Sequence, residues 1–242
     1  MRLNRNNDAN WGTKAGYDPA FLAFDTSGPY ISVALYCDRV VAENHVEMAR
    51  GQAENLIPLA ENVLTRSGGT WADLDYIAVG VGPGNFTGIR ISVSAARGLS
   101  LGLGIPVIGV STFETLLDWD GPISRPALIV SVEAPRGAAY VQHFRYGKPQ
   151  SAPRMIDPSA PPPDLELPMN MQVVGYKAEE IARSFHAEWE EEVPERNMAA
   201  RIGRMAEVKV FHNFWDGQQP KPLYVKAPDA APSREKPPVL LP

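Results

Sequence analysis

Residues 79–90 read Val79-Gly80-Val81-Gly82-Pro83-Gly84-Asn85-Phe86-Thr87-Gly88-Ile89-Arg90. An apolar run over 76–81 predicts a strand, and the helix that follows its Gly-Pro-Gly turn is expected over 87–103. Glycine takes backbone angles that a side chain forbids, and Pro83 stiffens the turn. Asn85 or Thr87 can cap the helix by accepting hydrogen bonds from its free N–H groups. The stretch therefore predicts either an anion-binding helix N-terminus or a plain strand-to-helix connection.

The residues around this unit predict an alternation of strands and helices. We expect strands over 21–25, 31–36, 39–45 and 106–110, and helices over 52–67 and 111–118. Apolar residues in the 52–67 segment recur along one face of a 3.6-residue period, with Pro58 expected to kink the helix. These elements are typical of an α/β domain that begins with antiparallel strands.

The second half of the chain predicts a less regular lobe. We expect strands over 127–132, 138–144 and 171–175, helices over 177–189 and 196–208, and an irregular proline-rich connection over 149–168. We therefore divide the chain into a disordered arm (1–20), an N-terminal lobe (21–118), a smaller second lobe (119–219) and a proline-rich tail (220–242).

Composition limits the function classes. The formal net charge of −5 disfavours tRNA binding by the chain alone, because lysine and arginine supply most affinity for phosphates. The single cysteine, Cys37, excludes an internal disulfide and suits a reducing compartment. No apolar run reaches the ~18 residues that span a membrane, and the polar first twenty residues do not form a secretory signal.

Three motifs in the N-terminal half resemble the TsaB family, also called YeaZ. They comprise residues 82–90 with 94–99 and 105–112, residues 21–27 with 31–35, and the tripeptide 56–58. The resemblance is dense over 21–117 and patchy over 126–242. It implies an α/β fold of two lobes, the actin-like ATPase (ASKHA, RNase H-like) fold, with mixed sheets flanked by helices.

The resemblance also implies a function. The chain would be a cytoplasmic, non-catalytic scaffold and activator of the complex that makes N6-threonylcarbamoyladenosine on tRNA. The implied partners are a TsaD-like catalytic subunit and a TsaE-like ATPase, with tRNA bound only through the complex and a homodimer when the chain is alone. No cofactor is implied for the chain by itself. Whether ATP or ADP binds with Mg²⁺ at the interface with the catalytic partner is a question that the resemblance leaves open. The alternative is a stand-alone ATP-using or peptidase-like enzyme of the same fold.

The predicted partner interface combines the small-residue helix with the 52–66 helix. In the family such a pair joins a second pair in a four-helix bundle. The candidate interface residues are Leu56, Leu59, Val63, Arg90, Ser92, Ala95, Ala96 and Arg97. Packing inside the chain would equally explain the apolar residues of the 52–66 helix. It explains less well why Arg90 and Arg97, seven residues apart, lie on one face of the other helix.

The resemblance places a vestigial nucleotide site at the first strand and the glycine turn. Its residues would be Asp25, Thr26, Ser27, Gly82 and Gly84. The alternative is that Asp25 and Thr26 hydrogen-bond their own turn. Segment 132–140 departs from the polar element of the family, and we expect a hairpin turn there with Gly137 at a positive dihedral angle.

The histidine pattern predicts no metal site. The four histidines (His45, His143, His186 and His212) have none of the paired spacings that bind zinc or iron on a helix. Gln52 stands where TsaB-like chains often carry a histidine. No serine lies in a G-x-S-x-G elbow, so we predict no catalytic residue in this chain.

Overall fold

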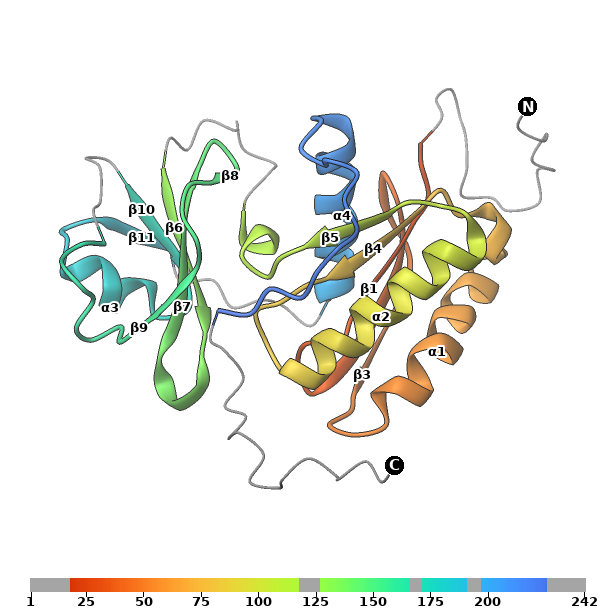
Figure 1. Ribbon diagram of the computed structural model, residues 1–242, viewed down its shortest axis with the longest axis horizontal. Helices are drawn as coiled ribbons and strands as arrows, with labels where there is room; N and C mark the ends of the chain where they lie inside the picture. The colour runs from red at the N-terminus through yellow and green to blue at the C-terminus, as the bar shows by residue number, and fades with distance from the viewer. Residues whose placement is uncertain (1–17, 118–126, 166–170, 191–196, 226–242) are drawn as a thin grey trace, which may run out of the picture.

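A computed structural model describes residues 18–117, 127–165, 171–190 and 197–225 as two mixed sheets with helices (Figure 1). The first sheet has the order β3-β2-β1-β4-β5. Its strands are β1 (Phe21–Asp25), β2 (Tyr30–Cys37), β3 (Arg39–Glu47), β4 (Tyr76–Gly80) and β5 (Val107–Val110). β1, β2 and β3 are antiparallel neighbours, whereas β4 and β5 run parallel to β1.

Both faces of the first sheet are buried, which explains why β1 is apolar from Phe21 to Phe24, before it ends at Asp25. Leu22 and Phe24 pack toward α1 (Gln52–Arg66) and α2 (Phe86–Leu103). Phe21 and Ala23 point to the opposite face, because successive side chains in a strand alternate. α1 continues through Pro58 as one helix, with the proline on its exposed side.

The opposite face of the first sheet is covered by α4 (Met198–Phe211), although this helix follows the second sheet in sequence. Its buried residues Ile202 and Met205 join the same apolar cluster as Phe21. At the start of α4, the Ala199 N–H donates to the Ser32 hydroxyl of β2 (3.1 Å). One of the orphan amides of the helix N-terminus is thus satisfied from the sheet.

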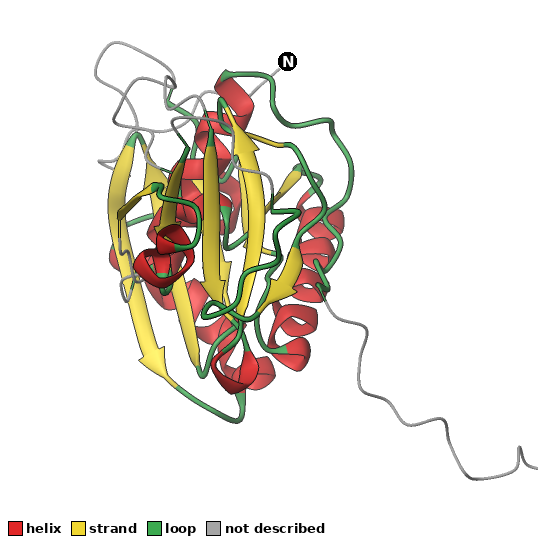
Figure 2. Ribbon diagram, turned by 90° about the vertical axis from the view of Figure 1, so that its left-hand side faces the viewer, coloured by secondary structure: helices red, strands yellow, loops and turns green. Residues whose placement is uncertain are grey.

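The second sheet has the order β11-β10-β6-β7-β8, with β9 also paired to β7. Its strands are β6 (Leu128–Glu133), β7 (Ala139–Arg145), β8 (Lys148–Pro149), β9 (Arg154–Ile156), β10 (Gln172–Gly175) and β11 (Glu188–Glu190). Figure 2 shows these strands side by side with α3 (Ala178–Arg183) in front of them. Short 3₁₀ turns occur at Trp71–Asp73, Glu114–Leu116 and Pro135–Gly137.

One apolar cluster joins the two sheets. Val130 and Phe144 of the second sheet pack in it with α4 and with Ala78 and Val110 of the first sheet. A separate cluster lies between the second sheet and α3, and includes Ile129, Val173 and Ile181. The first sheet, α4 and the second sheet therefore share one core.

Most expected elements are present, and two predicted helices, one in each half of the chain, are shorter than expected. The helix over 177–189 is wrong beyond Arg183: His186 takes a left-handed conformation (φ 53°), and the chain then pairs with β10 as β11. The other shortened helix was expected over 111–118; within its described residues 111–117, the helical structure is limited to the 3₁₀ turn Glu114–Leu116. The Ser111 hydroxyl accepts a hydrogen bond from the Glu114 N–H at the start of this turn (3.2 Å).

Three parts of the sequence-based division fall partly outside the described residues. These are most of the arm over 1–20, the lobe boundary near 118–126, and most of the tail over 220–242. Residues 219–225 are described, and they run back along the first sheet, where the Leu223 N–H donates to the Val81 carbonyl (2.8 Å). The lobe boundaries themselves stay a prediction.

Candidate functional site

The glycine turn between β4 and α2 brings two loops into direct contact. Gly82 has φ 92°, and the Asn85 side chain accepts from the N–H groups of Thr87 (2.9 Å) and Gly88 (3.2 Å). Asn85 therefore caps α2, as one of the two expected residues. The Asn85 N–H donates in turn to the Ser27 carbonyl (2.6 Å), which ties this turn to the loop after β1.

The glycines of the turn allow the two backbones to approach closely. A Cβ at Gly84 would lie 2.7 Å from the Ser27 carbonyl oxygen, and one at Gly88 would overlap the Thr26 carbonyl. The Thr26 hydroxyl donates to the Gly88 carbonyl (2.7 Å). These glycines therefore serve close packing of the chain on itself.

Asp25 lies at the centre of these loops and is 1% exposed. Its Oδ2 accepts hydrogen bonds from the Ser27 N–H (3.2 Å), the Ser27 hydroxyl (2.8 Å) and the Tyr30 hydroxyl (2.8 Å). Burial raises the pKa of the Asp25 carboxyl, and these hydrogen bonds lower it by less. Burial, together with the charge of Asp25, also raises the pKa of the Tyr30 hydroxyl, which therefore remains a donor.

The structure thus brings together all five residues of the predicted nucleotide site. Asp25 ends β1 and Thr26 and Ser27 follow it, whereas Gly82 and Gly84 follow the neighbouring parallel strand β4. The carboxyl ends of parallel strands meet at one edge of a sheet, which explains the juxtaposition. Asp25 accepts from Ser27 and Tyr30 of its own turn, as the alternative interpretation expects, whereas the Thr26 hydroxyl donates to the Gly88 carbonyl in the neighbouring loop.

Gln52 fixes the same loop from α1. Its side chain is 8% exposed, and its Nε2 donates to the carbonyls of Gly28 (2.8 Å) and Tyr30 (2.7 Å). Burying an amide costs little when its hydrogens find carbonyls in this way. The Gln52 side chain therefore holds the loop after β1 in place through these two hydrogen bonds.

The predicted interface residues divide between the core and the surface. Leu56, Val63, Ser92 and Ala96 are buried against the first sheet, Leu59 and Ala95 are half-buried, and Arg90 and Arg97 are exposed. The four buried side chains cannot reach a partner while the fold is intact. A partner would contact α1 and α2 only through outward positions.

The outer face of α2 consists of Ser94, Arg97, Gly98, Leu101 and Gly102, all of them exposed. Their spacing of three and four residues places them on one side of the helix. Leu101 is 87% exposed, and a Cβ added at Gly98 or Gly102 would meet no atom within 4 Å. The outer face of α2 is therefore small, flat and partly apolar.

Arg90 belongs to a contact that the sequence did not reveal. Its Nε donates to the Tyr224 hydroxyl (2.9 Å), and its guanidinium lies 3.8 Å from the centre of the Phe86 ring. The Phe86 and Tyr224 rings are 4.8 Å apart. Arg90 and Tyr224 are 134 positions apart, so no local signal in the sequence predicts this contact.

Segment 132–140 forms the expected hairpin turn between β6 and β7. Gly137 has φ 77°, and the Ala134 N–H donates to the Ala138 carbonyl (3.0 Å). Arg136 also has a positive angle (φ 64°), which the sequence did not predict.

The described ranges carry two features that bear on membrane and metal binding. Within those ranges, no helix is long and apolar enough to cross a bilayer. In the same part of the chain, no three His, Cys, Asp or Glu side chains are grouped closely enough to hold a metal ion. The predicted absence of a metal stays a prediction.

Comparison with known proteins adds a family match. A family model described as "TsaD: tRNA N6-adenosine threonylcarbamoyltransferase" matches residues 43–188. The protein is 41% identical over 95 residues to the tRNA threonylcarbamoyladenosine biosynthesis protein TsaB of Escherichia coli K12, covering 39% of this chain and 41% of that one. It is 35% identical over 130 residues to TsaB of Bacillus subtilis, covering 52% and 55%. The chain spans about half the length of the curated relatives it matches.

Solved structures agree on the fold. A Pseudomonas aeruginosa protein described as similar to peptidase YEAZ has a TM-score of 0.63 at 21% identity, over 86% of this chain and 100% of that one. A ROK family protein from Streptococcus pneumoniae has a TM-score of 0.53 at 8% identity, over 81% and 100%. Two mixed sheets with flanking helices in this arrangement are the actin-like fold that the sequence predicts.

Proposed function

The chain belongs to the TsaD family, and from this premise we propose that it is a non-catalytic scaffold and activator in the synthesis of N6-threonylcarbamoyladenosine on tRNA. It binds a TsaD-like catalytic subunit through α1 and α2. A TsaE-like ATPase joins the complex, tRNA binds only to the assembly, and the chain pairs with itself when alone. The relatives named TsaB support this assignment.

The outer face of α2 is the observation that carries the proposal. Gly98 and Gly102 each destabilise an exposed helix by about 1 kcal/mol relative to alanine. Neither glycine is needed inside the described chain, because an added Cβ would meet open space. Close packing of a partner helix against this face would explain both glycines, because a side chain there would keep the two helices apart. The same contact would bury Leu101.

The loop around Asp25 supports a role without catalysis. The Asp25 carboxyl is buried and bonded to Ser27 and Tyr30, so a phosphate or a Mg²⁺-bound water has no open route to it. Nucleotide and metal in the complex then belong to the interface with the catalytic partner. A stand-alone ATP-using or peptidase-like enzyme would need this loop to rearrange, and ATP hydrolysis by the purified chain would indicate that alternative.

Co-purification with the tagged TsaD-like protein of the same genome tests the proposal. We expect wild type to co-elute, and Gly98→Glu or Leu101→Glu to weaken the complex about 100-fold, because an unpaired charge in an interface costs several kcal/mol. The matched control is Arg183→Glu, which places the same charge on the exposed side of α3. Co-elution of both α2 variants at wild-type levels, with the fold intact by circular dichroism, would contradict the proposed interface.

A further inference from the structure

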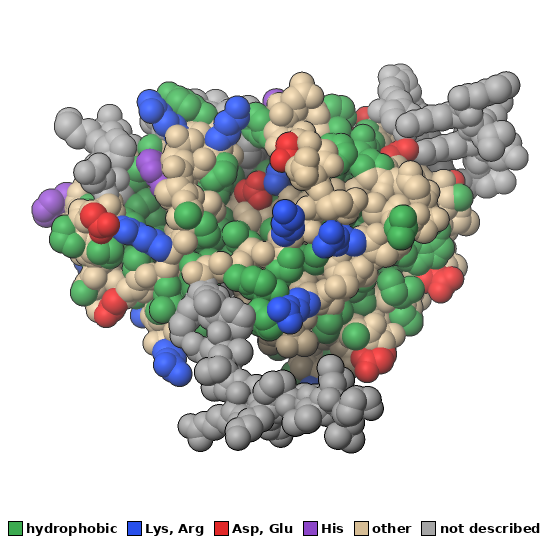
Figure 3. All heavy atoms as spheres, viewed as in Figure 1, with side chains coloured by type: hydrophobic (Ala, Val, Ile, Leu, Met, Phe, Trp, Pro, Cys, Tyr) green, Lys and Arg blue, Asp and Glu red, His purple; other side chains and the backbone are tan. Residues whose placement is uncertain are grey.

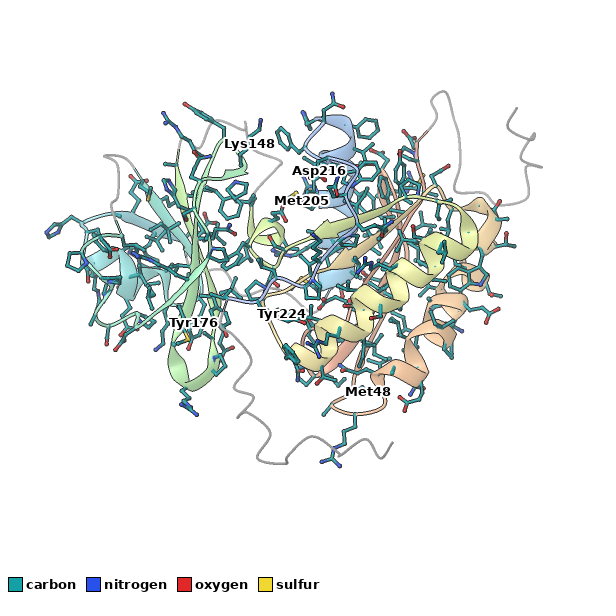
Figure 4. All side chains as sticks on the ribbon, viewed as in Figure 1. Met48, Lys148, Tyr176, Met205, Asp216 and Tyr224 are labelled. Atoms are coloured by element: carbon teal, nitrogen blue, oxygen red, sulfur yellow. The ribbon has the colours of Figure 1, made fainter. Side chains whose placement is uncertain are left out.

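The segment that follows α4 returns to the first sheet and is held there by several contacts. Pro220 is buried against β5. The Leu223 N–H donates to the Val81 carbonyl (2.8 Å), and the Tyr224 ring lies 4.8 Å from the Phe86 ring. Figure 4 shows Tyr224 beside the first turn of α2. The segment therefore leads the chain to the start of this helix.

The outer face of α2 begins where this segment arrives. Arg90 donates to the Tyr224 hydroxyl, and the exposed positions that follow along the helix end at Leu101 and Gly102. In Figure 3, viewed as in Figure 1, the surface over the middle of α2 is mostly green and tan, the colours of apolar and uncharged groups. A chain that continues from Tyr224 needs to span only about 17 Å to reach Leu101, because a helix rises by ~1.5 Å per residue.

The sequence continues from there with a proline-rich spacer and an apolar tripeptide. The spacer covers residues 226–238, and Val239, Leu240 and Leu241 follow it. A coil of this length has a root-mean-square span of roughly 20 Å, which matches the distance along α2. The effective concentration of a tethered group is highest when the two lengths match, and it then reaches the millimolar range. Tethering therefore favours even a weak apolar contact between the tripeptide and α2.

The tripeptide also fits the spacing of the two exposed glycines. Leu241 precedes Pro242, and the residue before a proline is restricted to extended conformations. Alternate side chains of an extended chain, here Val239 and Leu241, lie on one side and are roughly 6.6 Å apart. Gly98 and Gly102 are about 6 Å apart along the helix axis, and an added Cβ at either would meet open space. The open space above the two glycines therefore has the spacing of these two side chains.

The exposed Leu101 supplies the apolar surface for this contact. Its side chain is 87% exposed, and covering apolar surface is favourable in proportion to the area removed from water. The prolines of the spacer restrict its conformations, which reduces the entropy lost on docking. A segment of the same chain also loses no translational freedom, unlike a second molecule. These terms favour the chain's own residues 239–241 as the occupant of this face.

We propose that residues 239–241 cover the outer face of α2 in the free protein, as an autoinhibitory segment that a partner helix displaces. The inference rests on the proposed function, because the segment and the partner use the same face. A second copy of the chain competes with the segment in the same way. A cover that is in place about two-thirds of the time weakens apparent partner affinity about threefold, since only the uncovered fraction binds.

Self-association of a chain that ends at Val225 tests the proposal. This chain keeps every described residue, including Tyr224 and its contact with Arg90. We expect sedimentation to give a dimer dissociation constant about ninefold lower than that of the full chain, because both copies must otherwise uncover the face. Affinity for the TsaD-like subunit should rise about threefold. In the full chain, Leu241→Asp has the same effects, and the matched control Ser233→Asp leaves both affinities unchanged.

Disulfide formation within one chain gives a second readout that needs no partner. Arg97→Cys and Pro242→Cys place one thiol on the outer face of α2 and the other beside the tripeptide, whereas the native Cys37 is buried. We expect Leu241→Asp to slow closure of this disulfide about threefold, because the covering segment no longer holds the thiols together. Ser233→Asp should leave the rate unchanged. Comparison within one pair of cysteines separates docking from the simple reach of the chain.

Three results would overturn the proposal. The first is equal self-association of the full and the shortened chains, and the second is an equal disulfide rate with and without Leu241→Asp. The third is weaker pairing of the shortened chain, because residues 226–242 would then add to the interface. Failure of both chains to bind the TsaD-like subunit would contradict the proposed function instead, and the disulfide rates would still decide the present inference.

Discussion

At the residue scale, two glycines of α2 have opposite roles. Gly88 faces the Thr26 carbonyl with no room for a Cβ, whereas Gly98 faces open space. We therefore expect Gly88→Ala to destabilise the fold by about 2 kcal/mol or more, and Gly98→Ala to stabilise it by up to ~1 kcal/mol. Urea unfolding of the two variants measures both values. A similar change in unfolding free energy in both variants would contradict the idea that the close approach of the Thr26 carbonyl requires a glycine at position 88.

Asp25 gives stability a pH dependence of defined sign. Its folded pKa lies above its ordinary value of 3.8, so the folded state holds this proton more tightly. The contribution of Asp25 is therefore greatest at low pH and declines as the pH rises from about 4 through the folded pKa. The loss amounts to about 1.4 kcal/mol for each unit that separates the two pKa values.

Asp25→Asn isolates this effect, because its amide oxygen can still accept from Ser27 and Tyr30. We expect the unfolding free energy of the variant relative to wild type to rise between pH 4 and pH 7. Asp25→Ala, which leaves three donors without their acceptor, should be destabilised at every pH. A constant difference between Asp25→Asn and wild type over this range would contradict the raised pKa.

At the element scale, the contact of Arg90 in α2 with Tyr224 in the C-terminal segment can be measured by a double-mutant cycle. Tyr224→Phe removes the hydroxyl that accepts from Arg90 and keeps the ring on Phe86. Both partners are exposed, so we expect a coupling energy of about 0.5–1 kcal/mol between Arg90→Ala and Tyr224→Phe. Strictly additive changes in thermal unfolding would show that the hydroxyl does not hold Arg90.

Local signals in the sequence were sufficient to predict several elements. Features that depend on contacts between distant residues could not be predicted from them. The observed bounds of β1 are those expected, and the cap at Asn85 forms with N–H groups only two and three residues away. The end of α3 depends on the left-handed turn at His186 and on pairing with β10, which periodicity cannot report. The burial of Leu56 and Ala96 depends on a sheet that assembles from strands far apart in sequence.

At the scale of the whole molecule, the shared core predicts cooperative unfolding. Ile202 of α4 is 1% exposed and packs in the cluster that joins both sheets. We expect Ile202→Ala to destabilise the protein by about 2–5 kcal/mol and to lower amide-exchange protection equally in β1 and β6. Leu101→Ala, at the most exposed leucine of α2, is the control and should change stability by less than about 0.5 kcal/mol. Unchanged protection in β6 would mean that the sheets unfold separately.

The actin-like fold followed from the family motifs of residues 21–117, and the structural relatives confirm it. The predicted nucleotide-site residues converge as the motif order implies, yet the Ser27 hydroxyl bonds to Asp25 and the Thr26 hydroxyl bonds to the Gly88 carbonyl. A cavity of about 360 Å³ between the two sheets could not be predicted from the sequence, because its walls come from β5, β7 and the segment after α4. Such a cavity exists only once both sheets have packed together.

The return of α4 to the first sheet has a consequence for synthesis on the ribosome. The strands of that sheet are complete at Val110, but the helix that covers their second face ends only at Phe211. At ~5–20 residues per second, the intervening chain takes roughly 5–20 s to translate. During that interval the face that includes Phe21, Ala78 and Ile108 has no cover of its own, so a nascent-chain chaperone has its natural target there.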